Sequence, residues 1–368
     1  MKVKTAVTLQ SNIQKACKEL ANQLGVSGPG VILYFASTEY SPQTLAAEME
    51  KTFPGSKLFG CTTAGEIVTG KMLKKSVVAM ALPSDIIEDV CIQVVENIKV
   101  VDHLGEAFKN FEEYYHIPTA EFDLSKYVGI VLMDGLSGSE EKVLEKIGDL
   151  SDLTFIGGSA GDDLKFKETF VFANGKAYPN AAILALVKTR NGFDTIKTQS
   201  FSATPIKLIA TNVDESTRRV NSFNGRPALQ AYADALAVPR EEAANHFMSS
   251  PVGLMIDNEP YIRSPQQAQG DSIIFYCNIK QGMELSILKS IDIISDTRKA
   301  LAEKIEQIGP AAAIINFNCI LRRLELEKLN KTDAYGQVFQ EIPTIGFSTY
   351  GEAYVGHINQ TAVMLVLK

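Results

Sequence analysis

The sequence predicts an α/β fold, in which two related domains carry mixed β-sheets built from repeated β-α-β-β units. The first observation is a short phrase that occurs near both ends of the chain, "GCTTAGEI" at 60–67 and "GFSTYGEA" at 346–353. Both fit the pattern Gly-x-(Ser/Thr)-Thr-x-Gly-Glu, and an apolar segment precedes each. The second observation is that the segments around these phrases repeat the same order of parts, which indicates a duplicated fold.

Three segments of the chain share this order. Each begins with an apolar run, continues with a helix-like segment, reaches a turn that contains Gly, and closes with a second apolar run. The opening runs are 31–37, 129–135 and 313–319, the turns are "LFGCTTAGEI", "FIGGSAGDD" and "TIGFSTYGEA", and the closing runs are 76–82, 181–187 and 361–367. From the opening run to Gly65, Gly161 or Gly351 the separations are 34, 32 and 38 residues (31 to 65, 129 to 161, 313 to 351). We therefore expect these glycines at matching turns.

Each part has a physical interpretation. The opening runs are continuous and rich in β-branched residues, which is typical of central strands covered on both faces. The middle segments have helical spacing: Leu45, Met49 and Phe53 lie four residues apart. Ser41–Pro42 is suited to begin the first of these helices, and Ser137-x-x-Glu140 predicts a capping box before the second. A strand, a helix and a strand predict parallel pairing through a right-handed connection, after which the closing run returns antiparallel.

The segments between these parts predict further elements. In the second segment, "TFVFANGKAYP" predicts an inserted hairpin that turns at Asn174–Gly175. Amphipathic helices are expected over 102–116 and 226–236. A break in the pattern near 190–200 is the best place for a domain boundary. The predicted domains are 1–196, which is internally duplicated, and 197–368.

The composition excludes several classes of function. The net charge is −7 and the pI about 5.3, which argues against a nucleic-acid surface. No apolar run approaches the ~18 residues of a membrane-spanning helix, and the N-terminal segment lacks the apolar stretch of a secretory signal. The five cysteines are far apart, which is typical of reduced thiols, and the four histidines show no metal-binding spacing. We therefore expect a cytoplasmic protein without a nucleic-acid partner, membrane insertion or a metal site.

The signature turns bring hydroxyl groups, a Gly and a carboxylate together, and the first two turns supply Thr63, Glu66, Ser159 and Asp162. Gly permits close backbone approach, and hydroxyls with turn amides can bind the polar groups of a ligand. The carboxylate could hold an amine or orient an Arg. The alternative is that Thr and Ser satisfy a tight turn while the acid forms a structural ion pair. Because such turns are common, spacing alone favours the structural alternative.

A second polar cluster lies near the C-terminus. The phrase "FNCILRR" (317–323) ends an apolar run, and Tyr350, Glu352 and Asn359 follow in "STYGEAYVGHINQT". Arg322 at the end of a strand is well placed to bind a carboxylate or phosphate with both arms of its guanidinium. The alternative is that Arg322 and Glu352 form a structural pair.

The combination of "GCTTAGEI", "FIGGSAGDDLKFKETFVFANGK", "FNGRPALQAY", "FNCILRR" and "IGFSTYGEAYVGHINQT" resembles the FIST family of sensory proteins. The first two phrases look like the N-terminal FIST domain and the other three like the C-terminal one. The resemblance implies an intracellular signal-input module that binds small ligands such as amino acids. Some bacterial members are described as haem-containing nitric-oxide sensors that act on a partner histidine kinase. By this resemblance haem b is a candidate cofactor, with His357 and His246 as candidate axial ligands.

The sequence therefore predicts a sensor that captures a small ligand and acts through a partner protein such as a histidine kinase. The ligand is expected to be an amino acid or a similar small anion, or haem for nitric-oxide sensing. No catalytic residue is predicted. The predicted ligand-binding residues are Thr63, Glu66, Ser159, Asp162, Arg322, Tyr350, Glu352 and Asn359. Two alternatives stay open: an enzyme that uses Cys319, paired with His357, or the acidic turns, and an interaction scaffold without a ligand.

Overall fold

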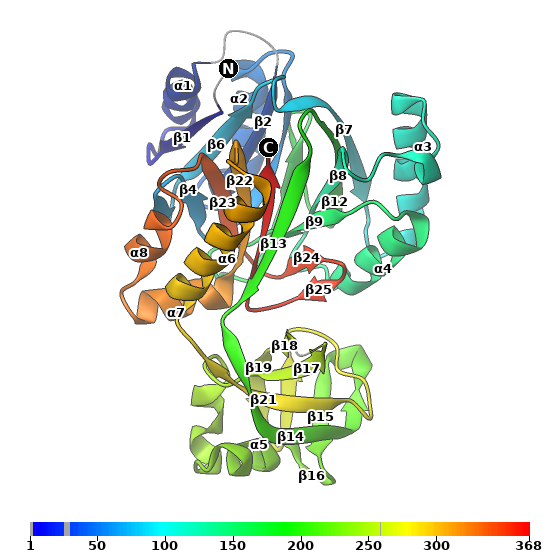
Figure 1. The fold of residues 1–368 in the computed structure, drawn as a ribbon, viewed down its shortest axis with the longest axis vertical. Helices are drawn as coiled ribbons and strands as arrows, with labels where there is room; N and C mark the ends of the chain where they lie inside the picture. The colour runs from blue at the N-terminus through cyan, green and yellow to red at the C-terminus, as the bar shows by residue number, and fades with distance from the viewer. Residues whose placement is uncertain (1–2, 26–29, 258) are drawn as a thin grey trace. The chain divides into compact units, whose positions relative to one another are not determined.

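The computed structural model describes residues 3–25, 30–257 and 259–368 and shows a mixed α/β chain, as the sequence predicts (Figure 1). The chain forms two compact units. Unit 1 comprises Met1–Lys197, Arg298–His357 and Ala362–Lys368, and unit 2 comprises Thr198–Thr297 and Ile358–Thr361. The predicted domains 1–196 and 197–368 do not coincide with these units, because the chain returns to unit 1 at Arg298. Unit 1 therefore contains all three signature turns.

Each repeat in unit 1 has a first strand, a helical segment, a second strand parallel to the first, a hairpin, and a closing strand antiparallel to the first. Repeat 1 consists of β2 (Val31–Ser37), α2 (Pro42–Thr52), β3 (Lys57–Thr63) and β6 (Val77–Leu82). Repeat 2 consists of β8 (Tyr127–Met133), α4 (Glu140–Leu150), β9 (Phe155–Ser159) and β12 (Ala181–Thr189). Repeat 3 consists of β22 (Ala313–Cys319), α7 (Ile320–Lys328), α8 (Thr332–Gln337), β23 (Thr344–Thr349) and β26 (Thr361–Leu367). The predicted repeat is confirmed in all three segments.

The hairpins extend the sheets of other repeats. They are β4 (Glu66–Val68) with β5 (Lys71–Leu73), β10 (Val171–Ala173) with β11 (Lys176–Tyr178), and β24 (Glu352–Tyr354) with β25 (His357–Ile358). Strand β4 of repeat 1 pairs with β23 of repeat 3, β24 of repeat 3 pairs with β9 of repeat 2, and β10 of repeat 2 pairs with β3 of repeat 1. This exchange closes a cycle, so the three repeats are interlocked.

Three six-stranded sheets result, with the orders β1-β6-β2-β3-β10-β11, β25-β24-β9-β8-β12-β7 and β13-β26-β22-β23-β4-β5. The additional edge strands are β1 (Lys4–Thr8), β7 (Ile87–Glu96) and β13 (Phe193–Gln199). Every residue of β2, β8, β22 and β26 is buried, which confirms that the continuous apolar runs are central strands. The sheets are mixed, as predicted, because each first strand has one parallel and one antiparallel neighbour.

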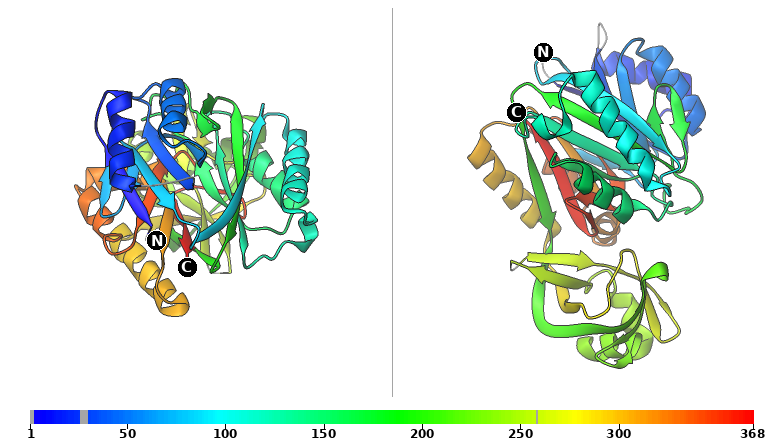
Figure 2. Two further views of the ribbon diagram at one scale, coloured as in Figure 1. Left: turned by 90° about the horizontal axis from the view of Figure 1, so that it is seen from above. Right: turned by 90° about the vertical axis from the view of Figure 1, so that its right-hand side faces the viewer.

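Helices cover the faces of these sheets. α1 (Ile13–Leu24) and α2 lie against each other beside the first sheet, and α3 (Leu104–Tyr115) and α4 lie against each other beside the second (Figure 2). The helix predicted over 102–116 is thereby confirmed as η1 (Val101–His103) and α3. Apolar side chains of each pair complete a buried core with the strands, as Leu45 does for the first sheet and Phe108 for the second. No helix in the described ranges combines the length and the apolar character needed to cross a membrane.

Two local predictions have different outcomes. The hairpin predicted at Asn174–Gly175 is confirmed: both residues have positive φ, +51° and +69°, as a two-residue type I′ turn requires. The capping box at Ser137-x-x-Glu140 is wrong, because α4 begins at Glu140 and Ser139 takes the N-cap position. The Ser137 hydroxyl instead donates to the carbonyl of Asp134, so the turn that precedes the helix uses it.

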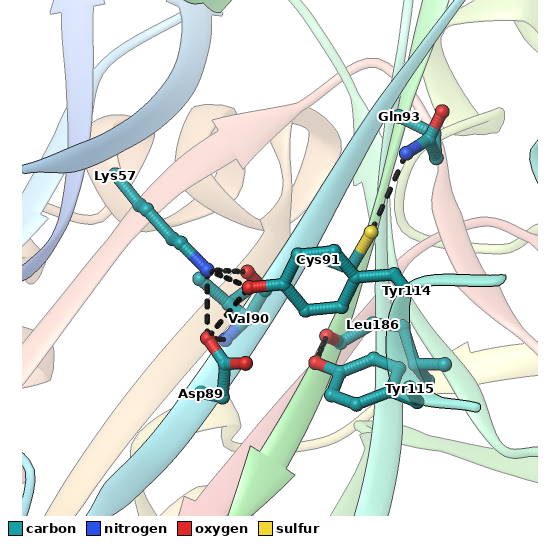
Figure 3. A network of polar contacts seen from close by, with 8 residues as sticks. All are labelled: Lys57, Asp89, Val90, Cys91, Gln93, Tyr114, Tyr115 and Leu186. Carbon is teal, nitrogen blue, oxygen red and sulfur yellow. Dashed lines mark hydrogen bonds and ion pairs between the residues drawn. The ribbon is translucent and has the colours of Figure 1, made fainter. Parts of the chain in front are cut away.

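A polar network joins the first sheet to the second (Figure 3). Lys57, at the start of β3, donates from Nζ to Asp89 Oδ1 (2.7 Å) and the Val90 carbonyl (2.6 Å) on β7, and to the Tyr114 hydroxyl (2.5 Å) on α3. Burial alone would raise the pKa of Asp89, but the hydrogen bond from Lys57, with further ones from Val90 and Tyr114, holds it below its ordinary value. The network is partly exposed to water, so we assign it a structural role.

Unit 2 is built on an eight-stranded antiparallel sheet. Its strands in spatial order are β18 (Glu259–Arg263), β17 (Val252–Ile256), β21 (Glu284–Ser290), β14 (Phe201–Asp214), β15 (Arg219–Phe223), β20 (Ser272–Phe275) and β19 (Pro265–Gln269), with β16 (Arg226–Pro227) paired to β15. The helix predicted over 226–236 is confirmed as α5 (Ala228–Leu236). It buries Leu229 and Tyr232 against this sheet, together with side chains of η4 (Arg240–His246). The remaining helix, α6 (Ile293–Ile308), leads the chain back to unit 1.

Candidate functional site

The three signature turns occupy matching positions in the fold. Gly65 follows β3, Gly161 follows β9 and Gly351 follows β23, and each precedes the hairpin of its repeat. This confirms the expectation that the three glycines lie at equivalent turns. We call the residues 62–66, 158–162 and 348–352 the signature hub.

Backbone hydrogen bonds connect the parts of the signature hub in the same cycle as the hairpins. The turn of repeat 1 bonds repeat 3 through Ala64 N and Ser348 O (3.1 Å), and the turn of repeat 2 bonds repeat 1 through Gly161 N and Thr62 O (3.0 Å). The turn of repeat 3 bonds repeat 2 through Ser159 N and Gly351 O (2.8 Å). Gly is required at these places because a Cβ on Gly161 would lie 2.6 Å from the backbone nitrogen of Ala64.

In repeat 1 the hydroxyl and the carboxylate of the signature bind each other. The Thr63 hydroxyl donates to Oε1 of Glu66, and Ser76 donates to Oε2 from its backbone nitrogen (3.1 Å) and from its hydroxyl (2.6 Å). Glu66 is fully buried, and this burial raises the pKa of its carboxyl to about 7. These contacts satisfy both oxygens within the protein, which supports the structural alternative for this pair.

Repeat 3 repeats this arrangement and repeat 2 departs from it. The Thr349 hydroxyl donates to Glu352 Oε1 (2.5 Å), and Glu352 is fully buried. In repeat 2, Asp162 instead accepts hydrogen bonds from three backbone nitrogens of 166–168 and from the Tyr350 hydroxyl (2.5 Å). The Ser159 hydroxyl is left without a hydrogen bond to the described residues. The structure thus brings Asp162 and Tyr350 together, one from repeat 2 and one from repeat 3.

Arg322 lies inside the protein rather than at a crevice. It is 1% exposed, its Nε donates to Asn318 Oδ1 (3.0 Å), and its guanidinium carbon lies 6.0 Å from the centre of the Tyr335 ring. The Tyr335 hydroxyl donates to the same Asn318 oxygen (3.0 Å). Arg322 therefore belongs to a buried network that joins β22, α7 and α8.

The neighbouring residue, Arg323, has a different environment. Its Nε donates to Glu327 Oε1 (2.7 Å), while its Nη1 has no hydrogen bond to the described residues although Arg323 is only 2% exposed. The guanidinium lies against Gly65, because a Cβ on Gly65 would lie 1.9 Å from Nη1. Sequence reasoning missed Arg323 because both arginines follow the same apolar run. One sequence feature could have distinguished the two arginines. Glu327 follows Arg323 by four residues, and on a helix this spacing predicts an ion pair between the two side chains.

Arg323 lines a cleft of about 170 Å³, which we call the Arg323 cleft. All three repeats contribute to its wall: Glu39, Ala64, Lys74 and Lys75 from repeat 1, Asp163 and Leu164 from repeat 2, and Ile320, Arg323, Leu324 and Glu327 from repeat 3. Ala64 belongs to the signature hub and lines the cleft, so the hub borders this cavity.

Charges of both signs face the Arg323 cleft. Lys74 binds Glu327 (2.7 Å), which also accepts from Arg323. Burial alone would raise the pKa of Glu327, but the hydrogen bonds from these two cations hold it below its ordinary value. Asp163, which also lines the cleft, accepts at Oδ2 from the hydroxyls of Ser37 (2.8 Å) and Thr38 (3.2 Å). A molecule with a carboxylate and an ammonium group would find a partner for each.

The other predicted residues lie elsewhere. Cys319 is 1% exposed at the junction of β22 and α7, which keeps its sulfur from a substrate in solution. Asn359 is 1% exposed and belongs to unit 2, as does His246, at the end of η4. His357 is 8% exposed on β25.

The assignment of His357 and His246 as haem ligands stays a prediction, and two observations count against it. A b-type haem needs an apolar slot beside its axial ligand. The His357 ring lies against the Gly351 backbone, since a Cβ there would be 2.1 Å from its Cε1. Neither His357 nor His246 lines the Arg323 cleft or either of two other cavities in the described chain, which have volumes of about 540 and 350 Å³.

Comparison with known proteins agrees with the arrangement of the signature hub. The model of the FIST N domain matches residues 30–226, and that of the FIST C domain matches 228–354. The chain belongs to the FIST family. FIST domains are associated with sensing in signal transduction through small ligands, and they are not a known enzyme family. The predicted boundary near 196 stays a prediction, since the two family models meet at 226–228.

One curated relative of this FIST protein is the uncharacterized protein MJ1623 of Methanocaldococcus jannaschii. It is 23% identical over 262 residues, which are 66% of this chain and 50% of the relative. The chain thus matches about half the length of that protein, whose printed name assigns it no function.

Proposed function

We propose that this FIST protein is a signal-input module that binds an amino acid or a similar small anion in the Arg323 cleft. One observation carries the proposal: Nη1 of the buried Arg323 has no hydrogen bond to the described residues, yet Arg323 lines the cleft. A buried charged donor without a partner is costly, and a carboxylate is the group that a guanidinium binds best. A ligand carboxylate at Nη1 would remove this cost.

The rest of the Arg323 cleft supports a small dipolar ligand. Lys75 lines the cleft as a further cation besides Arg323 and Lys74, and Asp163 offers a carboxylate oxygen to an ammonium group. The volume of about 170 Å³ is well below the ~300–1,000 Å³ of pockets that hold drug-sized molecules. The cleft therefore selects ligands with few heavy atoms.

Output through another protein is part of the proposal. The association of FIST domains with signal transduction supports a downstream partner, for which a histidine kinase is one candidate, and a cytoplasmic location. Capture rather than turnover is favoured because the proposed nucleophile, Cys319, is buried. Haem is the less favoured ligand, since the His357 ring packs against the Gly351 backbone and neither His357 nor His246 lines the Arg323 cleft.

The test is a thermal-shift screen of the full chain against L-amino acids and small organic acids. We expect a ligand that stabilises the wild type and does not stabilise Arg323→Lys, because Lys keeps the charge but loses the forked geometry. Loss of such hydrogen bonds costs roughly ten- to a hundredfold in affinity. Arg322→Lys is the matched control: it should lower the melting temperature by itself and keep the shift that the ligand causes.

The screen can also contradict the proposal. Equal stabilisation of wild type and Arg323→Lys by the same ligand would exclude Arg323 as the anchor. If no ligand stabilises the wild type, the visible spectrum after haem reconstitution decides between the alternatives: a Soret band favours the haem sensor, and its absence favours the scaffold.

A further inference from the structure

The loop that follows the second signature turn has an unusual backbone. We call residues 163–168 the strap, which leads from the turn after β9 toward β10. Three of its residues have left-handed φ, Asp163 at +55°, Leu164 at +64° and Phe166 at +50°. Two of these carry large apolar side chains, and Leu164 is 40% and Phe166 55% exposed. Left-handed backbone is unfavourable for such residues, so contacts around the strap must impose it.

Asp162 and Tyr350 supply these contacts. The Asp162 carboxylate accepts from the backbone nitrogens of Phe166 (2.9 Å), Lys167 (2.6 Å) and Glu168 (3.2 Å). The Tyr350 hydroxyl donates to Asp162 (2.5 Å) and accepts from the Leu164 nitrogen (2.8 Å). The Tyr350 ring stacks on Phe166 with a centroid distance of 5.3 Å. Two residues that the sequence predicts as ligand contacts thus hold the strap.

The strap also forms part of the Arg323 cleft. Asp163 and Leu164 line the cleft together with Arg323. A loop with half-exposed apolar side chains, held by a few hydrogen bonds, opens at a lower free energy than the strands around it. Opening of the strap would remove one wall of the cleft.

We propose that the strap is a lid over the Arg323 cleft and that Tyr350 is the latch that holds it closed. The ligand side of this inference rests on the proposed function, whereas access to Arg323 can be measured without any ligand. A ligand whose carboxylate binds Arg323 and whose ammonium group binds Asp163 would connect the closed strap to α7. Tyr350 belongs to repeat 3 and the strap to repeat 2. A ligand that holds the lid closed would therefore affect the structure of both repeats.

The test compares Tyr350→Phe with wild type in the full chain. The substitution removes only the hydroxyl, and Tyr354→Phe is a matched control because the Tyr354 hydroxyl lies 3.4 Å from Thr195 Oγ1, away from the strap. Two readouts are used: hydrogen exchange of the strap amides, and the rate at which phenylglyoxal modifies Arg323, resolved by mass spectrometry. We expect both rates to rise roughly ten- to a hundredfold in Tyr350→Phe, the effect of the two hydrogen bonds lost with the hydroxyl, and not in Tyr354→Phe.

A second variant keeps the inference testable if Tyr350→Phe fails to fold. Leu164→Gly suits φ of +64° and keeps the bond from the backbone nitrogen to Tyr350, while it removes the side chain from the cleft wall. It should speed modification of Arg323 without speeding exchange of the strap amides. Unchanged modification of Arg323 in both variants, or an equal rise in the Tyr354→Phe control, would overturn the lid.

The two proposals fail differently. If the screen finds no ligand but Tyr350→Phe speeds modification of Arg323, the lid stands and the proposed ligand does not. If a ligand binds through Arg323 and its dissociation rate is the same in Tyr350→Phe as in wild type, the latch is refuted and the proposed function stands.

Discussion

Replacing Gly65 with Ala should lower the free energy of unfolding by about 2.5–6 kcal/mol, the sum of two separate costs. The first is backbone strain: Gly65 has φ of +125°, which L side chains rarely adopt, and such strain costs roughly 1–3 kcal/mol. The second is displacement of Arg323, because the new Cβ would lie 1.9 Å from its Nη1. If the guanidinium moves, it loses its charge-assisted hydrogen bond to Glu327, at roughly 1.5–3 kcal/mol.

A double-mutant cycle separates the two costs. In the Arg323→Ala background the clash is absent, so Gly65→Ala should cost only the strain of roughly 1–3 kcal/mol. Gly138→Ala is the matched control, since Gly138 also has positive φ (+64°) but has no atom within 4 Å of the site where a Cβ would be placed. Urea unfolding followed by circular dichroism gives each free energy, a suitable signal for a chain without Trp.

The cycle also gives the result that would refute this reasoning. Equal destabilisation by Gly65→Ala and Gly138→Ala would mean that Arg323 does not press on the turn. A cost of Gly65→Ala that is unchanged by Arg323→Ala would mean the same. In either case the guanidinium would lie elsewhere, and the Arg323 cleft would lose its main cation.

Two further predictions concern the signature hub. Thr349→Val should lower the free energy of unfolding by roughly 1–3 kcal/mol, because it removes the hydroxyl that donates to the buried Glu352. Ser159→Ala at the equivalent position should cost little, since the Ser159 hydroxyl has no hydrogen bond to the described residues. Urea unfolding compares the two variants, and equal losses would contradict the hydrogen bond from Thr349 to Glu352. Burial raises the pKa of the Glu66 carboxyl from near 4.5 to about 7, so the folded state keeps the carboxyl protonated to a higher pH than the unfolded state does. The stability that Glu66 contributes is therefore present below about pH 4.5 and is lost as the pH rises through 7. Wild type should therefore lose up to about 3 kcal/mol relative to Glu66→Gln across this range, and a difference that stays constant with pH would contradict the raised pKa of Glu66.

The repeats could be predicted from the sequence because their signals are local. A continuous run of β-branched residues predicts a buried strand, and helical spacing of apolar residues predicts the buried face of a helix. Asn174–Gly175 predicts the turn of a hairpin. Each of these signals lies within a few residues of the chain. The three glycines follow for the same reason, since Gly stands wherever another backbone or side chain comes too close for a Cβ. The family resemblance rests on these same phrases.

The exchange of hairpins could not be predicted from the sequence. Strands β4, β10 and β24 carry the same kind of short apolar pattern whether they pair within their own repeat or with another. Only the edges that the folded sheets leave open decide the partner, and β4 finds its partner about 280 residues away, at Ile345 opposite Val68. The return of the chain to unit 1 at Arg298 is equally a matter of tertiary contacts.

The sequence also could not show which of two adjacent arginines, Arg322 or Arg323, lines the cleft. The sequence by itself placed two arginines at the end of a buried strand, next to the third signature turn. Because α7 begins directly at Ile320, successive side chains point about 100° apart around the helix axis. Arg322 therefore packs on Asn318 and Tyr335, and Arg323 faces Gly65 and the cleft. Which of two adjacent side chains meets a ligand depends on where the helix starts and on what packs beside it, and tertiary structure alone decides both.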